Sequence, residues 1–264
     1  MIKYLILGPG ALGYFSLLGH LKKLHNKHLL HELKEISGSS AGSILGFLYI
    51  VYKGNIDEIL KTSLAIDLQA LTKAQLSSLL IKYGFVDIST VKVILSNICK
   101  RRMGEGDPTF EQLFEHMNVN LYISAYCVTD NKTEYFSLGT HPSLSVIDAV
   151  CASIAIPILF STSSINNKIY IDGGTHEKMP SVPFLGHKLE DIYSIEITRT
   201  LTNDEKIKDF KSYIMNLMNS TMVNRITCET IPSTKTLDMQ NFDILNFKLN
   251  DFEKLRLFVF GYTA

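Results

Sequence analysis

Gly38-Ser39-Ser40-Ala41-Gly42 is the stretch around which the sequence is organised. Residues 33–36 before it predict a buried strand, and residues 43–52 after it predict an apolar helix. Ser40 has glycine two positions before it and two positions after it, which gives the pattern G-x-S-x-G. Such a turn holds a serine hydroxyl clear of a sheet, where the hydroxyl can attack a carbonyl group. We therefore predict that Ser40 is a nucleophile and that Gly38 and Gly42 let strand and helix approach closely.

A glycine-rich loop follows the first predicted strand, Tyr4–Leu7, and precedes a predicted helix over residues 14–24. The loop is Gly8-Pro9-Gly10-Ala11-Leu12-Gly13. Backbone N–H groups at a helix N-terminus can bind an anion, so this loop can stabilise the oxyanion of an acyl-transfer transition state. A phosphate-binding loop of a nucleotide site is the alternative. The loop lacks the Lys-Ser/Thr pair of that motif and matches G-x-G-x-x-G only in part, which favours the oxyanion role.

Asp172-Gly173-Gly174 lies far beyond Ser40 in the sequence and directly follows a predicted strand over residues 168–171. A carboxylate can remove the serine proton if it reaches the serine oxygen at hydrogen-bond distance. Active sites of open α/β sheets lie at the carboxyl ends of the strands. Because Ser40 and Asp172 both follow predicted strands, we predict that they meet at this edge, with Asp172 as general base. Taken alone, an aspartate before two glycines is also a common turn.

The order of predicted elements gives an α/β fold. Strand and helix alternate at the N-terminus, which implies parallel strands joined by helical crossovers. We expect three layers, α/β/α, around a central, mostly parallel sheet, in a single domain over residues 1–264. The other predicted elements are a hairpin of strands 121–128 and 133–138, a helix over 144–154, a strand over 192–198, a helix over 205–222, an edge strand over 243–248 and a last helix over 253–260.

Residues 54–118 show helical patterns without strands and predict a lid-like helical layer beside the sheet. Two helix starts within this layer can be predicted from polar residues. Ser89 can cap a helix that ends before Gly104. Thr109 and Gln112 have the spacing of a capping box.

Composition excludes several classes of protein. Hydrophobic residues make up 46% of the 264 residues, which predicts a packed core and argues against disorder. Lys+Arg and Asp+Glu both number 26, so the net charge gives no argument for binding nucleic acid. The four cysteines lack metal-ligand spacing and predict reduced thiols, and we expect no metal and no cofactor.

The N-terminus, MIKYLILGPG, lacks the long apolar segment of a signal peptide, and no stretch reaches the roughly 20 apolar residues of a membrane span. We therefore expect a cytoplasmic protein that is not secreted. The mean hydropathy of +0.12 is compatible with peripheral contact with a lipid surface.

Taken together, these motifs resemble the patatin-like phospholipase family. The first glycine loop resembles the oxyanion loop of that family, residues 38–42 match its elbow, and Asp172-Gly173-Gly174 matches its D-G-G/A motif. Residues 152–157 with Phe160 resemble its A-S-x-A-x-P-x-x-F block. The resemblance spans nearly the whole chain. It implies the patatin fold and a lipid acyl hydrolase that uses a Ser40–Asp172 dyad and an acyl-enzyme without a metal. The implied substrate is a phospholipid or acylglycerol, reached by transient contact with a membrane surface.

The resemblance also assigns the oxyanion loop. Pro9 occupies a glycine position of the family pattern and has no N–H group to donate. We assign the oxyanion role to the backbone of Gly8, Gly10 and Ala11, together with Ala41 after the nucleophile. The resemblance also implies that Gly13, Gly173 and Gly174 are structural glycines of the family's motifs.

Two alternatives stay open at the level of sequence. Leu12 replaces the basic residue of the family, and Lys178 stands where asparagine is usual. With Pro9, these departures suggest a lipid-binding or interaction protein that keeps the fold and has weak catalysis. The second alternative is an α/β-hydrolase esterase, because His176 and His187 follow Asp172 in the chain order of a Ser-Asp-His triad. In that fold, however, more strands precede the elbow.

Overall fold

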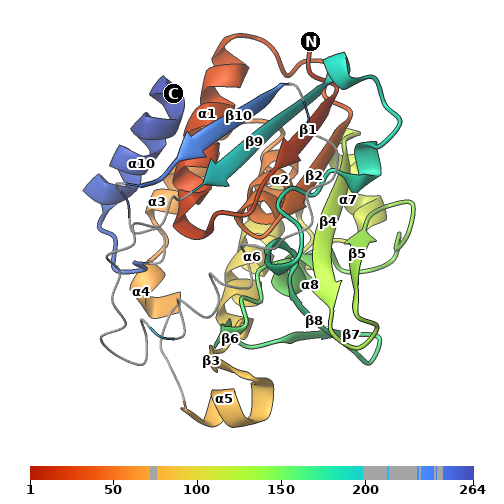
Figure 1. Cartoon of the computed structure of the whole chain (residues 1–264), viewed down its shortest axis with the longest axis vertical. Coiled ribbons are helices and arrows are strands. Elements are labelled where there is room, and N and C mark those ends of the chain that lie inside the picture. The colour runs from red at the N-terminus through yellow and green to blue at the C-terminus, as the bar shows by residue number, and fades with distance from the viewer. Residues whose placement is uncertain (72–75, 199–212, 214–230, 232, 241, 243–245) are drawn as a thin grey trace.

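The computed structural model describes residues 1–71, 76–198, 213, 231, 233–240, 242 and 246–264. Within these residues a central sheet of eight strands runs through the molecule (Figure 1). Its order is β10 (Thr234–Asp238), β9 (Ile192–Thr198), β1 (Tyr4–Leu7), β2 (Glu35–Ser39), β4 (Asn120–Cys127), β8 (Lys168–Asp172) and β7 (Ser163–Ile165), with β5 (Lys132–Phe136) paired to β4. Neighbours from β10 to β4 are parallel, and the remaining pairs, including the predicted β4–β5 hairpin, are antiparallel.

Helices flank this sheet, with one exception. The described helices are α1 (Tyr14–Asn26), α2 (Ala41–Val51), α3 (Ile56–Leu64), α4 (Leu68–Leu71), α5 (Leu76–Lys82), α6 (Ser89–Met103), α7 (Phe110–Met117), α8 (Val146–Ser153) and α10 (Asp251–Thr263). The exception is α5, which packs on the separate strand β3 (Gly84–Val86). α2 packs on β1, β2 and β4, and α8 packs on β4, β7 and β8. The expected α/β fold with a central, mostly parallel sheet flanked by helices is therefore confirmed. Among the described helices, none combines the length and apolar composition that crossing a bilayer requires.

The first strand is buried on both faces, which explains its unbroken apolar sequence. Leu5 and Leu7 belong to the main hydrophobic core, which also contains the buried side chains of α1 and α2. Ile6 points to the opposite face and packs in a second, smaller core with Phe184. Phe184 ends a 3-10 turn, Val182–Phe184, that covers part of this second face. The sheet is thus held by apolar contacts on both sides.

Residues 54–118 are mainly helical, but the expectation that they contain no strand is wrong. β3 (Gly84–Val86) pairs in parallel with β6 (Ile158–Phe160) in a separate two-stranded sheet. The three residues of β3 are too few to show the alternation of a strand. Their pairing depends on β6, which is far away in the sequence, so this strand could not be predicted. The capping box of Thr109 and Gln112 is present, with hydrogen bonds in both directions. Ser89 is the first residue of α6 and does not cap it, because Ile88 stands at the N-cap position.

The edge strand of the sheet is not where the sequence predicted it. Asn246–Lys248, the described part of the expected strand over 243–248, lies outside any strand and runs into a turn. The edge is instead β10, whose five residues pair with β9 from Ser194 to Thr198. The predicted helix over 205–222 falls outside the described residues apart from residue 213.

The C-terminal helix α10 closes the main core by packing along α1. Ser16 Oγ donates a hydrogen bond to the carbonyl of Leu257 over 2.8 Å. His20 Nδ1 lies 3.3 Å from the carbonyl of Gly261, and His20 Nε2 lies 2.9 Å from Tyr193 Oη. A carbonyl can only accept, so Nδ1 carries a proton. Burial lowers the pKa of His20, so the ring is neutral near pH 7 and Nε2 accepts from the tyrosine.

This arrangement predicts a loss of stability in acid. Burial lowers the pKa of His20 from 6.5 to about 4. Between these values the unfolded chain binds a proton that the folded chain does not, so stability falls as pH falls from about 6.5 to about 4. Between pH 7.5 and 4.5 we expect His20 to account for a loss of about 2 to 3 kcal/mol. Urea unfolding at both pH values, compared with His20→Gln, measures this contribution; equal pH dependence in both proteins would contradict it.

Candidate active site

Ser40 lies at the sharp turn between β2 and α2. Its backbone has φ 53° and ψ −122°, a strained conformation for a residue with a side chain. The Ser40 N–H donates to Ser153 Oγ over 2.9 Å, and the Ser40 carbonyl accepts from Ser43 Oγ over 2.7 Å. The side chain of Ser40 is buried. The turn therefore has the strained geometry that the G-x-S-x-G pattern predicted, and it is held from two sides.

Glycine is required beside this turn because backbones approach closely there. A Cβ atom at Gly42 would lie 2.1 Å from the carbonyl oxygen of Leu7, and one at Gly38 would lie 2.6 Å from the carbonyl oxygen of Gly42. Any larger residue would push α2 away from β1 and β2. The spacing of the two glycines therefore has a steric cause.

Asp172 ends β8 and is buried. Its Oδ1 accepts a hydrogen bond from the N–H of Gly174 over 2.7 Å, and its carbonyl accepts from Thr175 Oγ1 over 2.6 Å. These bonds close the turn after the strand and fix the direction of the carboxylate. Asp172 is thus a turn residue, and this position is compatible with a chemical role.

The register of β4 brings the two turns together. Two strands that pair with the same residue of β4 must lie on opposite edges of β4. β5 and β8 both pair with Ala125–Cys127, so they lie on opposite edges. β2 and β5 both pair with Ser124, so they also lie on opposite edges. β2 and β8 therefore lie on the same edge and run towards each other. Ser39 pairs with Ser124, and Asp172 pairs with the next residue, Ala125. The chain leaves β2 at Ser40 where β8 ends, so Ser40 and Asp172 come from two strand ends that meet.

Contacts of the glycine turn agree with this register. A Cβ atom at Gly173 would lie 2.6 Å from Ser124 Oγ, and one at Gly174 would lie 2.5 Å from Pro9 Cβ. The turn after Asp172 is therefore packed between the end of β4 and the N-terminal glycine loop. All three sequence motifs meet at one place in the structure.

A short segment after α8 is hydrogen-bonded to both strand ends. Ser153 Oγ accepts from the N–H of Ser40, and the carbonyl of Ala155 accepts from the N–H of Asp172 over 3.0 Å. Both Ser153 and Ala155 are buried. Because the two partners lie only two residues apart, residues 153–155 tie the backbone of Ser40 to that of Asp172. We call this segment the 153–155 bridge.

Removing the Ser153 hydroxyl should disturb the candidate site. In Ser153→Ala the buried N–H of Ser40 loses its partner, which costs about 1 to 3 kcal/mol of stability. The turn that holds Ser40 also loses one of its restraints, and we expect turnover of an ester substrate to fall about tenfold or more. Thermal unfolding and kcat together measure the two effects.

Ser16→Ala is a matched control, because it removes another buried hydroxyl bonded to a backbone group, at the α1–α10 contact. We expect a similar loss of stability there with kcat retained. A Ser153→Ala protein that keeps full kcat would show that the bridge is purely structural.

The N-terminal glycine loop leads into a 3-10 turn, Ala11–Gly13, that precedes α1. The prediction that Gly8 is an oxyanion donor is not compatible with its hydrogen bond, because the Gly8 N–H donates to the carbonyl of Ile195 over 3.0 Å as part of the sheet. The N–H groups of Gly10, Ala11 and Ala41 make no hydrogen bond to any other described residue. Ala11 and Ala41 border the pocket at Ser40. Unpaired backbone donors are thus present at the start of the 3-10 turn and at the start of α2.

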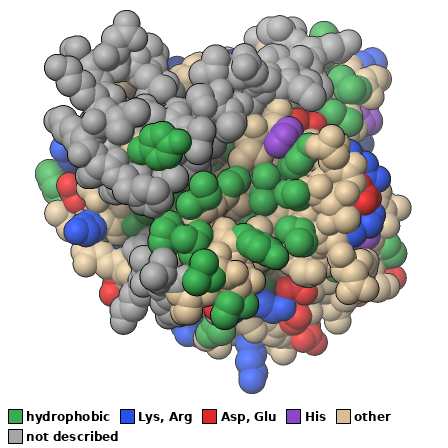
Figure 2. Space-filling model, turned by 60° about the horizontal axis from the view of Figure 1, so that its bottom comes forward, with side chains coloured by type: hydrophobic (Ala, Val, Ile, Leu, Met, Phe, Trp, Pro, Cys, Tyr) green, Lys and Arg blue, Asp and Glu red, His purple; other side chains and the backbone are tan. Residues whose placement is uncertain are grey.

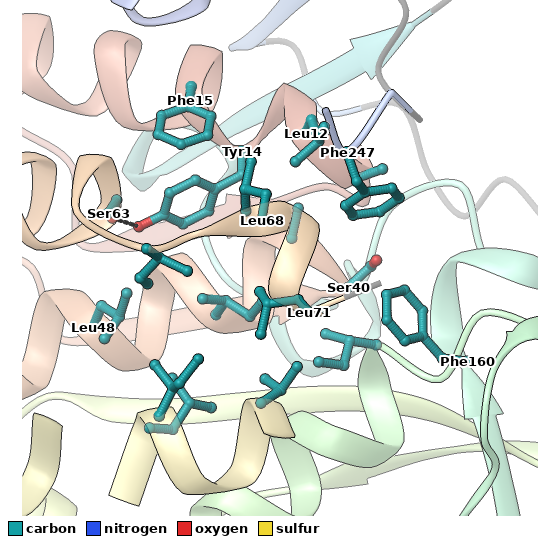
Figure 3. Close-up of a pocket in the computed structure, with 18 of the residues that line it drawn as sticks. Leu12, Tyr14, Phe15, Ser40, Leu48, Ser63, Leu68, Leu71, Phe160 and Phe247 are labelled. Atoms are coloured by element: carbon teal, nitrogen blue, oxygen red, sulfur yellow. Dashed lines mark hydrogen bonds between the residues drawn. The ribbon is translucent and has the colours of Figure 1, made fainter. Parts of the chain in front are cut away.

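A cavity of about 150 Å³ opens beside Ser40 (Figure 3). Its wall is apolar apart from the side chains of Tyr14, Ser40 and Ser63. The described residues that line it are Ala11, Leu12, Tyr14, Phe15, Ser40, Ala41, Ile44, Leu48, Ser63, Ile66, Leu68, Leu71, Val91, Ile94, Leu95, Ile98, Ile154, Ile156, Phe160 and Phe247. Figure 3 shows Ser40 between Phe160 and Phe247 at one end. Ser40 therefore borders a space suited to a hydrocarbon chain.

Comparison with known proteins agrees with this geometry. The family model of patatin-like phospholipases matches residues 5–185. The chain belongs to the patatin-like phospholipase family. The probable lipid hydrolase 463L of Invertebrate iridescent virus 6 is 28% identical over 255 residues, which cover 92% of this chain and 85% of that protein. The uncharacterized protein R571 of Acanthamoeba polyphaga mimivirus is 27% identical over 266 residues, which cover 94% of this chain and 86% of that protein.

Solved structures show the same patatin-like fold. VipD from Legionella pneumophila matches with a TM-score of 0.68 and 17% identity over 99% of this chain. The type III effector ExoU of Pseudomonas aeruginosa matches with a TM-score of 0.52 and 15% identity over 99% of this chain. This chain spans 65% of the VipD chain and 51% of the ExoU chain, so it corresponds to a part of each of those structures.

The three departures from the patatin-like pattern have structural explanations. Pro9 packs against Gly174 and so supports the turn after Asp172. Leu12 lines the pocket, where a basic side chain would place a charge in an apolar wall. Lys178 forms an ion pair with Glu196 of β9 over 2.6 Å. These substitutions keep the patatin-like loops in place by packing and charge.

The two histidines of the alternative triad have other contacts in this patatin-like chain. The ring of His187 stacks on Tyr4, at the end of β1 opposite to Leu7 and the glycine loop. The ring of His176 stacks on Tyr126 with centroids 3.3 Å apart, and its Nδ1 lies 3.0 Å from Thr175 Oγ1. Neither histidine lines the pocket at Ser40. The structure therefore gives no support to a Ser-Asp-His triad.

One group of possible metal ligands lies away from the pocket. Cys127, Asp130 and Glu134 bring their ligand atoms within 4.8 Å of one another. Lys168 Nζ lies 2.7 Å from Asp130, and Lys132 Nζ lies 3.2 Å from Glu134. The ammonium group of Lys168 lowers the pKa of the Asp130 carboxyl. Because the two carboxylates are paired with lysines, this group has no feature that points to a bound cation.

The bridge and the pocket could not be predicted from the sequence. Residues 153–155 belong to the A-S-x-A-x-P-x-x-F block, but this block does not reveal that they bond to two other motifs. The pocket wall includes Ile44 and Leu48 of α2 and Val91 and Ile94 of α6, at helical spacing. This spacing is the same as that of an ordinary core stripe, so the sequence could not distinguish the two.

Proposed function

We propose that this patatin-like protein is a lipid acyl hydrolase that cleaves carboxylic esters through Ser40 and Asp172. The observation that carries the proposal is that β2 and β8 end against each other on one edge of β4, with Ser40 bordering an apolar pocket. Family membership and the name of the viral lipid hydrolase support lipid hydrolysis as the general activity. The dyad and the acyl-enzyme are our inference from the geometry.

In the proposed reaction Asp172 accepts the proton of Ser40 Oγ as this oxygen bonds to the ester carbonyl carbon. The carbonyl oxygen becomes an oxyanion, which the N–H groups of Gly10, Ala11 and Ala41 can stabilise. Collapse expels the alcohol, which takes the proton from Asp172, and leaves an acyl group on Ser40. Water then attacks, Asp172 takes a proton from it, and the serine regains that proton when the carboxylic acid leaves.

The pocket supports an acyl chain as the part of the substrate that is recognised. Each methylene group that leaves water contributes about 0.8 kcal/mol to binding. The wall offers no charged side chain among the described lining residues. A phospholipid or acylglycerol fits this chemistry, because its ester joins a hydrocarbon chain to a polar part that can stay outside.

An exposed apolar patch near the pocket supports contact with a membrane surface. Leu80, Ile81 and Tyr83 are exposed on α5 and just after it. α5 lies at the lower end of the molecule in Figure 1, and Figure 2, which turns this end forward, shows hydrophobic side chains gathered there. β3 follows α5 and pairs with β6, which contains Phe160 of the pocket wall. A lipid surface touching the patch would lie close to the pocket.

A lipid panel with identification of the products tests the proposed function. The purified protein is incubated with phospholipid vesicles and with acylglycerols, and free fatty acid is measured by mass spectrometry. We expect fatty acid release from at least one lipid class. Transfer of the acyl group to an added alcohol would identify an acyltransferase, and no acyl cleavage by folded protein would refute the proposal.

A lipid-binding protein with weak catalysis is the second candidate. It is favoured by the oxyanion loop, where Pro9 has no N–H and the Gly8 N–H is used by the sheet. Each lost oxyanion donor typically costs about 10²–10³ in rate. A fluorophosphonate probe discriminates the two, because it bonds covalently to an activated serine. A folded protein that binds lipid and is not labelled would support the second candidate.

A further inference from the structure

We propose that the pocket accepts an acyl chain of about nine or ten carbons. Beyond that length the pocket is closed by Leu48 and by the hydrogen-bonded pair Tyr14 and Ser63. The number of carbons is the pocket length divided by about 1.3 Å, the advance per carbon of an extended chain with bonds of about 1.52 Å. This inference rests on the proposed function, because it takes Ser40 as the site where the ester carbonyl sits.

The axis of the pocket follows α2. Ser40, Ala41, Ile44 and Leu48 all line it, and these positions form one stripe of the helix. From residue 40 to residue 48 a helix advances by about 12 Å, at about 1.5 Å per residue. The stripe of α6 from Val91 to Ile98 provides another wall about 10 Å long. The length available from Ser40 is therefore set by helix geometry.

The far end carries a pair of buried hydroxyl groups. Tyr14 Oη lies 2.8 Å from Ser63 Oγ, and Ser63 Oγ donates to the carbonyl of Ile59 over 2.8 Å. Because the Ser63 hydroxyl donates its proton to the Ile59 carbonyl, the Tyr14 hydroxyl must donate to Ser63 Oγ. Burial raises the pKa of Tyr14, so the phenol stays protonated and keeps this bond. Figure 3 places the pair and Leu48 at the end opposite to Ser40.

This end is also anchored from outside the pocket. The buried Lys254 of α10 donates from Nζ to the carbonyl of Leu64 over 2.9 Å and to that of Ile66 over 3.0 Å. Ile66 lines the pocket just after the end of α3, and Ser63 lies in the last turn of that helix. Displacing α3 would break two of the three hydrogen bonds of this buried ammonium group and leave it only Asp251 as a partner, which is costly. A longer acyl chain would therefore have to fold back or leave its tail in water.

A series of p-nitrophenyl esters from four to sixteen carbons tests the length limit. We expect kcat/KM to rise to about ten carbons and to fall about tenfold or more by sixteen, since one poorly fitted methylene can cost about tenfold in specificity. Leu48→Ala opens the closed end, and its optimum should move to longer chains. Leu45→Ala is the matched control, because Leu45 is buried in the same helix and does not line the pocket. Its chain-length optimum should stay unchanged.

A binding assay separates this inference from the proposed function. Octanoate, decanoate and hexadecanoate are titrated into Ser40→Ala protein by calorimetry, which requires neither catalysis nor a Leu48 variant. Tighter binding of decanoate than of hexadecanoate would support the limit even if the wild-type protein hydrolysed no ester. Binding and hydrolysis that both strengthen through sixteen carbons would overturn the limit while leaving the proposed hydrolase intact.

Discussion

Replacing Ser40 by Ala is expected to lower ester hydrolysis by about 10⁴-fold or more, because loss of a catalytic serine removes the covalent route altogether. The substitution removes one oxygen from a buried side chain and leaves the backbone bond to Ser153 in place. We therefore expect the folded structure and its thermal unfolding to change little. Initial rates on a p-nitrophenyl ester and labelling by a fluorophosphonate probe measure the effect.

Ser39→Ala is the matched control for this variant. Ser39 is also a buried serine of the same motif, and its Oγ has no hydrogen-bond partner among the described residues. Removing it should change neither rate nor labelling. A Ser40→Ala protein that keeps its turnover would contradict the assignment of Ser40 as nucleophile. Equal losses of turnover in both variants would indicate that the substitutions damage the turn and not the chemical step.

Replacing Asp172 by Asn is expected to lower kcat by about 10²–10⁴-fold, the range that a positioned general base contributes. The amide has nearly the shape of the carboxylate, and its oxygen can still accept the bond from the Gly174 N–H. It cannot take the proton of Ser40. The turn should therefore persist while the reaction slows, and kcat with thermal unfolding of the same samples distinguishes these effects.

Glu177→Gln controls for loss of a nearby buried carboxylate. Glu177 is buried on the same loop, burial raises the pKa of its carboxyl, and it accepts a hydrogen bond from Tyr135. We expect kcat to survive this change. If Glu177→Gln were the inactive variant and Asp172→Asn the active one, the base would have to be reassigned.

Local structure was predictable wherever it depends on neighbouring residues. The strand Ile192–Thr198 has the predicted limits, and the capping box at Thr109 forms between residues three positions apart. The turn at Ser40 also follows from its own sequence, because glycines on both sides are what its strained geometry requires. The capping box and the approach of Gly38 to Gly42 are contacts within five residues, whereas the strand was predicted from its apolar sequence although its partners, β1 and β10, are distant.

Predictions were wrong where a distant partner decides the outcome. β3 becomes a strand because Gly84–Val86 meets β6, and β10 forms the sheet edge because it meets β9. Strand formation depends on hydrogen bonds and packing across the sheet, so short segments carry little signal of their own. The Gly8 N–H was likewise predicted to be a donor for an oxyanion, and its use by Ile195 appears only when β1 and β9 are paired.

The sequence by itself determined the three motifs and the α/β order of elements, since both rest on local conformational preference and hydrophobic pattern. Tertiary structure alone decided that β2 and β8 end against each other on β4, that residues 153–155 bond to both ends, and that the pocket stops at Tyr14 and Ser63. These features depend on strand register and helix packing, which relate residues far apart in the chain. The proposed catalytic geometry is a property of the sheet, and no single motif contains it.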